Sequence, residues 1–341
     1  MSPSTTSHTK TLNRAQRLLA TLAALLALQG CVPMPLTADL DPSLPQVRLN
    51  GHVLHAQAFG NPQAPVVVVV HGGPGADHRY LLGLQGLADQ YRVVFYDQLG
   101  SGLSERVPEG QISVSSFLAD LHAVVGHFSP GRPVALVGHS WGAMLATAYA
   151  GQHPQQVSRM VLAEPGFLDA DSLAGLQAGG WPGWRVVAGF ARAWLGQWRV
   201  SVQDDPMARA DWFLQQVMPL FSQPDSLCQG QLPPLQAWRF GSPAFAATLG
   251  RMRDDPAWAQ SLDFAQGLAD YRRPVLFLRG ACNQAQPETH QRLMMRRFHP
   301  EAQVRLQTVQ NAGHYMFNDQ PGTSLAMVRQ FLQEASPAPG H

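Results

Sequence analysis

The stretch VALVGHSWGAMLATAYAGQ, residues 134–152, decides the fold class of this chain. Its first four residues are apolar, as in a buried strand, and AMLATAYAGQ at its end is helix-like. Between them, Gly138 and Gly142 let the backbone turn tightly and let the strand and the helix approach each other. The segment therefore predicts a strand, a sharp turn and a helix, with Ser140 at the tip of the turn.

Strand-like and helix-like segments alternate on both sides of this unit. The β-branched run VVVVV after Pro65 is of the kind that is buried inside a parallel sheet. Further strand runs cover 91–97, 132–138, 157–163, 273–280 and 303–309, and helix-like stretches cover 113–127, 141–152, 288–297 and 323–334. Residues 46–59 alternate around Asn50-Gly51, which predicts a hairpin. Together these segments predict an α/β fold with a mostly parallel sheet covered by helices on both faces.

The alternation stops between residues 167 and 271. This region is helix-like, and seven of the eight tryptophans fall inside it: Trp181, Trp184, Trp194, Trp198, Trp212, Trp238 and Trp258. We expect a helical cap inserted into a core formed by residues 46–166 and 272–335. Most of these tryptophans are expected to pack within the cap, and a few to line a pocket beneath it.

The N-terminus has the pattern of an export signal. Three basic residues precede an 11-residue apolar run at 18–28, which is too short to span a bilayer. The run ends in LQGC, which resembles the lipobox of bacterial lipoprotein signals and implies a lipidated Cys31 after removal of residues 1–30. That resemblance implies a bacterial cell-envelope protein anchored to a membrane, and an ordinary cleaved signal is the alternative. The Pro-rich residues 31–45 suit an extended tether.

Composition excludes several classes of function. With 24 basic and 23 acidic residues, the chain has no charge excess that would indicate a nucleic-acid partner. The only lysine is Lys10, so the fold has no lysine for a Schiff base. No cluster of His, Cys and Asp has zinc-ligand spacing, and we predict neither a metal nor a cofactor. Cys228 and Cys282 either form a disulfide or are two buried thiols, and both alternatives stay open.

The turn around Ser140 matches G-x-S-x-G, in which a serine nucleophile projects from a strained turn between strand and helix. A glycine-rich turn without chemistry is the alternative. A second glycine-rich turn, HGGPG at 71–75, follows the VVVVV run and can aim backbone N–H groups at a developing oxyanion. We assign the N–H groups of Gly73 and Trp141 as the two donors. His71, like His52, His55 and His139, is interpreted as structural.

The segments HGGPG at 71–75, DQLGSGLS at 97–104 and GHSWGAMLA at 138–146 resemble the α/β-hydrolase superfamily, and more narrowly its proline iminopeptidase branch. The resemblance implies an eight-stranded core, a helical cap and a triad of serine, acid and histidine. It also implies that His314, in the segment that follows the last strand run, is the catalytic base.

The acid of the triad is less evident. Members of the superfamily usually carry an aspartate shortly after the penultimate strand, where this chain has Asn283. Some members supply the acid after the preceding strand, where VLAEPG places Glu164, and we assign Glu164 as the triad acid. Asp169 and Asp171 are weaker alternatives for this role, and a salt bridge to the cap is the structural alternative for Glu164.

The sequence thus predicts a serine hydrolase that cleaves a carboxylic ester or amide in a small-molecule or peptide-like acyl substrate with an apolar group. An aspartate-nucleophile mechanism is excluded, because position 140 is serine. A proline iminopeptidase-like aminopeptidase is the alternative, although residues 165–287 contain no glutamate to bind a free amine. Asp204, Asp205, Asp211, Asp254 and Asp255 are the candidates to replace such a glutamate, and solvated loop or helix-start residues are the structural alternative for them. A non-catalytic envelope binding lipoprotein is the alternative from another class. Activity is expected to fall with acid around pH 6–7 as His314 is protonated, on its unperturbed pKa.

Overall fold

The computed structural model describes residues 32–176, 184–234 and 236–334. The predicted signal peptide, Cys31 and Trp181 lie outside these residues. An eight-stranded sheet with the order β1-β2-β4-β3-β5-β6-β7-β8 forms the core. The strands are β1 (Gln46–Leu49), β2 (His52–Phe59), β3 (Val66–Val70), β4 (Arg92–Tyr96), β5 (Val134–His139), β6 (Val157–Ala163), β7 (Val275–Gly280) and β8 (Val304–Val309).

The sheet is parallel from β4 to β8, with the antiparallel β1–β2 hairpin at one edge. Leu49 pairs with His52 across the predicted Asn50-Gly51 turn. At the centre, Val68 of β3 lies opposite Val94 of β4 and Leu136 of β5. The predicted α/β fold with eight strands, mostly parallel, is confirmed.

The α-helices lie between the strands and in the insertion after β6. They are α2 (Val114–Phe128), α3 (Trp141–Gln152), α4 (Ala170–Ala174), α5 (Trp184–Gly196), α6 (Ala208–Val217), α7 (Ser242–Phe245), α8 (Arg251–Asp254), α9 (Pro256–Ser261), α10 (Glu288–Met295), α11 (Met316–Asp319) and α12 (Pro321–Gln333). The short helical turns used below are η1 (His78–Asp89), η3 (Gln197–Arg199) and η6 (Cys228–Gly230). Of these elements, η1 has no counterpart among the helix-like stretches predicted above.

Both faces of the sheet are buried, which explains why its central strand β3 is apolar at every position. Val66, Val68 and Val70 pack in the cluster that includes residues of α2, α3 and α10. Val67 and Val69 pack in the opposite cluster, with residues of η1, α11 and α12. Because successive side chains of a strand point to opposite faces, a strand covered on both sides needs an unbroken apolar run.

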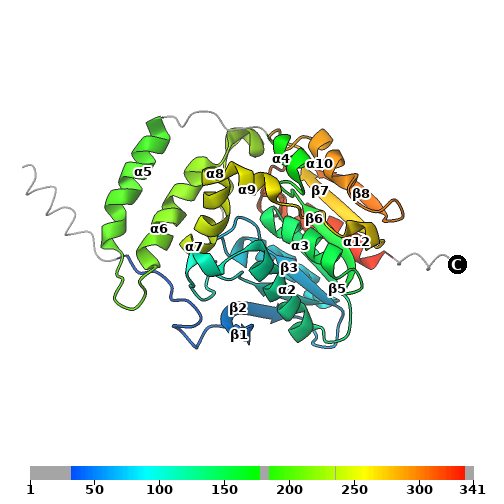
Figure 1. Ribbon diagram of the computed structural model, residues 1–341, viewed down its shortest axis with the longest axis horizontal. Coiled ribbons are helices and arrows are strands. Elements are labelled where there is room, and N and C mark those ends of the chain that lie inside the picture. The colour runs from blue at the N-terminus through cyan, green and yellow to red at the C-terminus, as the bar shows by residue number, and fades with distance from the viewer. Residues whose placement is uncertain (1–31, 177–183, 235, 335–341) are drawn as a thin grey trace, which may run out of the picture.

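The helices α4 to α9 belong to the insertion between β6 and β7 (Figure 1). In this view α5 lies at the end of the molecule farthest from β8, and α6 lies beside it. The inner side of α5 meets α6 through Ala193, which is buried with Leu214 and Val217. The insertion therefore forms a layer beyond the sheet edge at which the parallel strands end.

The segment predicted as a tether lies along the body of the molecule. Thr37 and Ala38 are both 1% exposed, and Ala38 N donates to the carbonyl of Leu103. Val32 forms a parallel bridge with Val200 next to η3. This part of the chain thus has fixed partners on both the core and the cap, which a free tether does not have.

Cys228 and Cys282 form a disulfide, with their Cα atoms 5.0 Å apart. The bridge joins η6 of the insertion to the loop that follows β7. Asp225 supports the same junction, because its carbonyl accepts the N–H groups of Gln284 and Ala285 at 2.7 and 3.2 Å. Of the two alternatives left open by the sequence, the structure contains the disulfide.

Candidate active site

Ser140 occupies the turn between β5 and α3 in a backbone conformation that side chains rarely adopt. Its φ is 54° and its ψ is −121°, and its N–H donates to the Ala163 carbonyl at 2.8 Å. The flanking glycines are required, because a Cβ on Gly138 would lie 2.5 Å from the Gly142 carbonyl oxygen and one on Gly142 would lie 2.0 Å from that of Val70. Such strain costs about 1–3 kcal/mol and is concentrated at functional sites.

Two unengaged N–H groups lie near Ser140. Gly72 packs directly against it, since an added Cβ there would lie 2.8 Å from the Ser140 Cβ, and Gly73 follows with φ 52°. Trp141 is the first residue of α3. In the described part of the chain, neither Gly73 N–H nor Trp141 N–H has a protein acceptor. Free donors beside a serine hydroxyl are the arrangement that stabilises an oxyanion.

His139 links the glycine-rich turn to the segment of His314 through a chain of hydrogen bonds. Gly72 N–H donates to Tyr80 Oη at 2.7 Å, Tyr80 Oη lies 2.8 Å from His139 Nδ1, and His139 Nε2 lies 2.8 Å from the His314 carbonyl oxygen. Because a carbonyl only accepts, Nε2 carries the proton and Nδ1 accepts from the tyrosine hydroxyl. Burial lowers the pKa of His139 to about 4, so the ring is neutral as this chain requires.

His314 lies after β8 and is half-buried. Its backbone N–H donates to the Ser226 carbonyl oxygen at 2.8 Å. Burial, and secondly the neighbouring His139, lower the pKa of His314 to about 3. The two imidazole rings are 4.8 Å apart between centroids. The expectation of an acid limb at pH 6–7 was based on an unperturbed histidine, and this environment shifts the His314 pKa well below that range.

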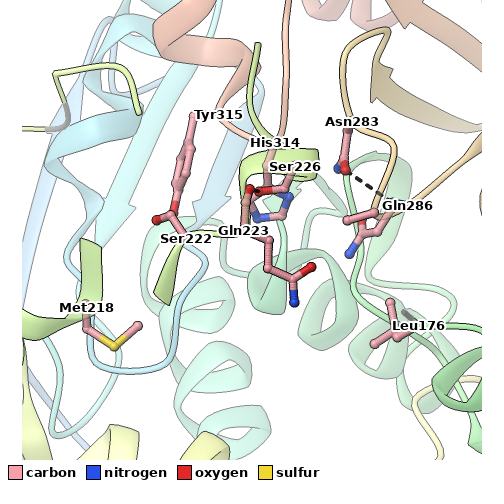
Figure 2. Close-up of a pocket in the computed structure, with 10 residues that line it drawn as sticks. Leu176, Met218, Ser222, Gln223, Ser226, Asn283, Gln286, His314 and Tyr315 are labelled. Atoms are coloured by element: carbon pink, nitrogen blue, oxygen red, sulfur yellow. Dashed lines mark hydrogen bonds between the residues drawn. The ribbon is translucent and has the colours of Figure 1, made fainter. Parts of the chain in front are cut away.

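Two cavities meet at His314. The larger, about 570 Å³, is lined by Gly73, Ser140 and His314. The smaller, about 280 Å³, is lined by His314, Asn283 and polar residues of the insertion. Figure 2 shows the smaller one, with Tyr315 on one side, Asn283 and Gln286 on the other, and His314 between them. The nucleophile and base candidates therefore face one common space.

Glu164 is fully buried at the end of β6, with a φ of 49°. Its Oε1 accepts from Gly280 N–H at 2.5 Å and its Oε2 from Asn283 Nδ2 at 2.7 Å. Burial raises the pKa of Glu164 to about 8, and the two hydrogen bonds oppose this rise. The carboxylate predicted as the acid is thus held by the asparagine at the position where the resemblance predicts an aspartate.

The Glu164 carboxylate is close to the His314 segment but does not touch the ring. An added Cβ on Gly280, which donates to Glu164, would lie 2.3 Å from the carbonyl oxygen of Gly313. Among the described residues, no hydrogen bond or ion pair joins Glu164 to His314, and none joins Ser140 Oγ to His314. The structure therefore gathers the three predicted residues at one sheet edge without closing the contacts between their side chains.

The other carboxylates considered from the sequence have structural partners elsewhere. Asp169 caps α4, and both Asp169 and Asp171 pair with Arg297 near the surface. Asp205 and Asp211 are buried against Arg239, and Asp254 pairs with Arg253 in solvent. None of these, nor Asp204 or Asp255, is among the described residues that line the cavity of Ser140.

One group in the described chain has metal-ligand residue types: the buried His55, His78 and Asp97. Both Asp97 oxygens are already engaged, by the two imidazole Nδ1 atoms at 3.0 and 2.7 Å and by the N–H groups of His78 and Leu103. These contacts hold the pKa of Asp97 well below its usual range. The group is a hydrogen-bonded support beneath the HGGPG turn. His71 is buried too, and its Nε2 accepts from Gln98 N–H.

The wall of the larger cavity is mostly apolar but contains no tryptophan among the described residues. Its apolar residues include Met218, Pro219, Leu232, Pro233, Pro234, Ala237, Phe240 and Leu249. Trp194 and Trp198 are instead 55% and 61% exposed. Trp194 and Trp198 lie on the outer side of the cap and are therefore not among the few tryptophans expected to line a pocket beneath it.

Sequence patterns did not indicate the roles of Tyr80 and Asn283. Tyr80 lies in η1, and its partners His139 and Gly72 are 59 and 8 residues away. The sequence marks Asn283 only as the residue in place of an expected aspartate, and its hydrogen bond to Glu164 spans 119 residues. A hydrogen-bond partner that distant leaves no local pattern, so only the folded chain identifies these residues.

Comparison with known proteins gives the family. Residues 65–321 match the family described as alpha/beta hydrolase fold. The chain belongs to the α/β-hydrolase family. It is a hydrolase-type enzyme, in agreement with the prediction from the serine turn.

Individual relatives of this α/β hydrolase are distant. It is 25% identical over 285 residues to a cis-3-alkyl-4-alkyloxetan-2-one decarboxylase from Xanthomonas campestris, which covers 80% of this chain and 90% of that protein. A proline iminopeptidase from Heyndrickxia coagulans is 37% identical over 100 residues, 29% of this chain and 34% of that protein.

Solved structures share the fold at low identity. An esterase from Exiguobacterium antarcticum gives a TM-score of 0.59 at 20% identity, covering 85% of this chain and 100% of that one. A proline iminopeptidase-related protein from Thermus thermophilus gives 0.56 at 22% identity, covering 84% and 95%. These likenesses concern the fold alone.

Proposed function

We propose that this α/β hydrolase cleaves carboxylic esters or amides through Ser140, His314 and Glu164. The observation that carries the proposal is the strained Ser140 turn, which lies beside two unengaged N–H groups and opens into a cavity shared with His314. Strained backbone persists only where the surrounding structure holds it, and such positions cluster at functional sites.

In the proposed reaction, His314 takes the Ser140 proton as the serine oxygen attacks the substrate carbonyl carbon. The N–H groups of Gly73 and Trp141 hold the oxyanion, and the leaving group takes the proton from His314 as the acyl-enzyme forms. Water, deprotonated by His314, then attacks the ester to Ser140. The acid product leaves, and the serine regains its proton.

The role given to Glu164 is to orient His314 and to stabilise its imidazolium form. Two of the roughly four acceptor positions of this carboxylate are used by Gly280 and Asn283, so it can still accept a bond from the ring. When the two groups come into contact, the carboxylate raises the pKa of the imidazole and the imidazolium lowers the pKa of the carboxyl group. Both changes are opposite to the shifts caused by burial. Side-chain contacts in unliganded active sites are often long and tighten with substrate.

The cavity favours an apolar acyl substrate over a free amine. Its mouth and wall carry methionine, proline, leucine and phenylalanine side chains, and its one described carboxylate is Asp77. That carboxylate accepts the N–H groups of Arg79, Trp238 and Arg239 and so has little capacity left for an ammonium group. We therefore place the ester or amide ahead of the aminopeptidase alternative.

We further propose that Cys31 is lipidated and that the enzyme acts at a bacterial envelope membrane. The lipobox-like LQGC and the apolar run before it support this location. No helix of the described chain is both long enough and apolar enough to cross a bilayer. Mass analysis of the N-terminal peptide tests the modification, and an unmodified Cys31 contradicts it.

Covalent labelling with a fluorophosphonate probe tests the catalytic proposal. We expect labelling of the wild-type chain, no labelling of Ser140→Ala, and hydrolysis of p-nitrophenyl esters by the wild-type chain alone. A panel of esters of increasing chain length, together with prolyl and other aminoacyl naphthylamides, separates esterase from aminopeptidase activity. A folded wild-type chain that neither reacts with the probe nor hydrolyses any member of the panel would support the non-catalytic binding protein instead.

A further inference from the structure

The outer side of the cap carries a row of large apolar side chains in solvent. Val187 is 63% exposed, Trp194 55%, Leu195 52% and Trp198 61%. We call these four residues, on α5 and η3, the α5 patch. Soluble proteins rarely expose contiguous large apolar side chains unless the surface binds something.

Packing within the molecule does not explain the α5 patch. The helix α5 already has a buried side, where Ala193 meets Leu214 and Val217 of α6. A helix at a protein surface usually turns polar residues outward, and one that is apolar on both sides is normally buried. The outer side of α5 therefore requires an apolar partner outside the described chain.

The path of the N-terminus indicates which partner this is. Val32 N–H donates to the Arg199 carbonyl at 3.1 Å, and Val32 bridges Val200. The residue that follows Cys31 is therefore fixed beside η3, at the end of the α5 patch. The apolar run at 18–28 precedes it in the sequence. Any membrane attachment through this N-terminus brings the patch to the lipid surface.

The composition of the α5 patch and its surroundings matches a lipid interface. The Arg209 guanidinium lies 4.6 Å from the centre of the Trp198 ring, and Arg192 is exposed on α5. Tryptophan is enriched at the headgroup level of membranes, and arginine beside apolar residues favours anionic lipids. Attachment of the N-terminus to a membrane would bring lipid to the patch, whereas nothing in the structure directs a second copy of the chain to it.

We propose that the α5 patch rests on a phospholipid membrane, with Trp194 and Trp198 in the headgroup region. This docking rests on the proposed membrane attachment of the N-terminus, and it does not depend on the proposed hydrolysis. It would place the active-site cavity one helix from the lipid, because Phe213 of α6 lines the groove under the patch while Gln215 and Gln216 line the cavity of Ser140.

Tryptophan quenching by brominated lipid tests the docking. The full chain is bound to vesicles of phosphatidylethanolamine and phosphatidylglycerol whose acyl chains carry bromine, which quenches only tryptophans in contact with it. Residues 1–31 contain no tryptophan, so the N-terminal anchor contributes no signal. We expect quenching of the wild-type chain, and loss of most of it in Trp194→Phe/Trp198→Phe.

Trp258→Phe is the matched control, because Trp258 lies on α9 against Arg251 and outside the patch. It should leave the quenching unchanged, and all variants should keep the wild-type thermal midpoint. Absence of quenching in wild type, or equal quenching in the double variant, overturns the proposal. So does a dimer in sedimentation without lipid that Trp194→Glu/Trp198→Glu dissociates, because the patch would then bind a second copy.

Discussion

At the residue scale, Glu164 and Asn283 form a buried pair at the end of β6. Asn283 occupies the position where the resemblance to the superfamily predicts an aspartate, and its amide donates to the Glu164 carboxylate at 2.7 Å. An aspartate at 283 would put a second buried carboxyl beside Glu164, and two such groups cannot both ionise. The asparagine is therefore the residue type that a glutamate at 164 requires.

Replacing the acid tests this pair. We expect kcat/KM of the wild type to rise with pH around 8, because Glu164 must lose its proton to assist His314 and burial raises its pKa to about 8. Glu164→Gln should lower kcat by up to about 10⁴-fold and remove that rise. Ester hydrolysis measured from pH 5 to 10 gives both results.

The double variant Glu164→Gln/Asn283→Asp is the control for this prediction. It moves the carboxylate to position 283, where the resemblance to the superfamily predicts it, and should recover part of the activity that the single variant loses. A Glu164→Gln enzyme with wild-type kcat and an unchanged pH profile would remove Glu164 from the mechanism.

Tyr80 is predicted to position the site without touching substrate chemistry. Tyr80→Phe leaves the Gly72 N–H and His139 Nδ1 without their shared partner, and an unsatisfied buried group costs about 1–3 kcal/mol. We expect a lower kcat with little change in KM, because the oxyanion turn and the His314 segment lose their link. Tyr271→Phe is the matched control, since the buried Tyr271 hydroxyl has no hydrogen-bond partner among the described residues. Equal kinetics for both variants would contradict this role.

At the scale of elements, the disulfide between η6 and the loop after β7 holds the insertion against the catalytic edge. The two cysteines are 54 residues apart in the sequence. In the loop-entropy model, closing a loop of that length stabilises the folded chain by about 4 kcal/mol. The same junction contains the Ser226 carbonyl that accepts from His314 N–H. Loss of the bridge should therefore affect both stability and turnover.

Removal of the bridge gives the measurement. Cys228→Ser/Cys282→Ser should lower both the thermal midpoint and kcat, and reductant should do the same to the wild type while leaving the double variant unchanged. If reductant shifts neither quantity in the wild type, although thiol titration shows that the bridge is open, the bridge does not stabilise the site.

The elements themselves follow from local patterns. The helix-like stretch 141–152 corresponds to α3, and the VVVVV run corresponds to β3. The sequence patterns do not predict the helical turn η1. Its apolar residues Leu81, Leu84 and Leu87 are three residues apart, and the glycines between them do not favour a helix. Its position depends on packing against the sheet face shared with α12.

At the scale of the whole molecule, a buried ionic cluster joins the cap, the core and the N-terminal segment. Arg239 pairs with Asp205 and Asp211, and its Nη1 also donates to the Pro35 carbonyl at 2.9 Å. Arg106 of the core pairs with the same Asp211 at 2.9 Å. Because all four side chains are withdrawn from water, each charge depends on its partners.

Arg239→Met should therefore destabilise the protein strongly. It leaves buried carboxylates without their cation, which costs about 3–5 kcal/mol where a buried pair is broken. Arg253→Met is the matched control, because its pair with Asp254 is exposed to solvent and such pairs contribute little to stability. Urea unfolding compares them, and similar midpoints for the two variants would contradict a joining role for the cluster.

The sequence by itself determined the order of strands and helices, the Ser140 turn and the place of His314, because each depends on neighbours a few residues away. Hydrophobic period and glycine conformation are fixed locally, so they can be read without a fold. Glu164 follows β6 directly, as its place after a strand run predicts.

Only the tertiary structure decided which distant groups meet. It joined Cys228 to Cys282, held Glu164 between Gly280 and Asn283, and turned Trp194 and Trp198 outward. These contacts span tens to more than a hundred residues, and their geometry results from packing of the whole chain. A local pattern can specify that a residue is apolar or charged, but the direction and partner of its side chain depend on what the fold brings beside it.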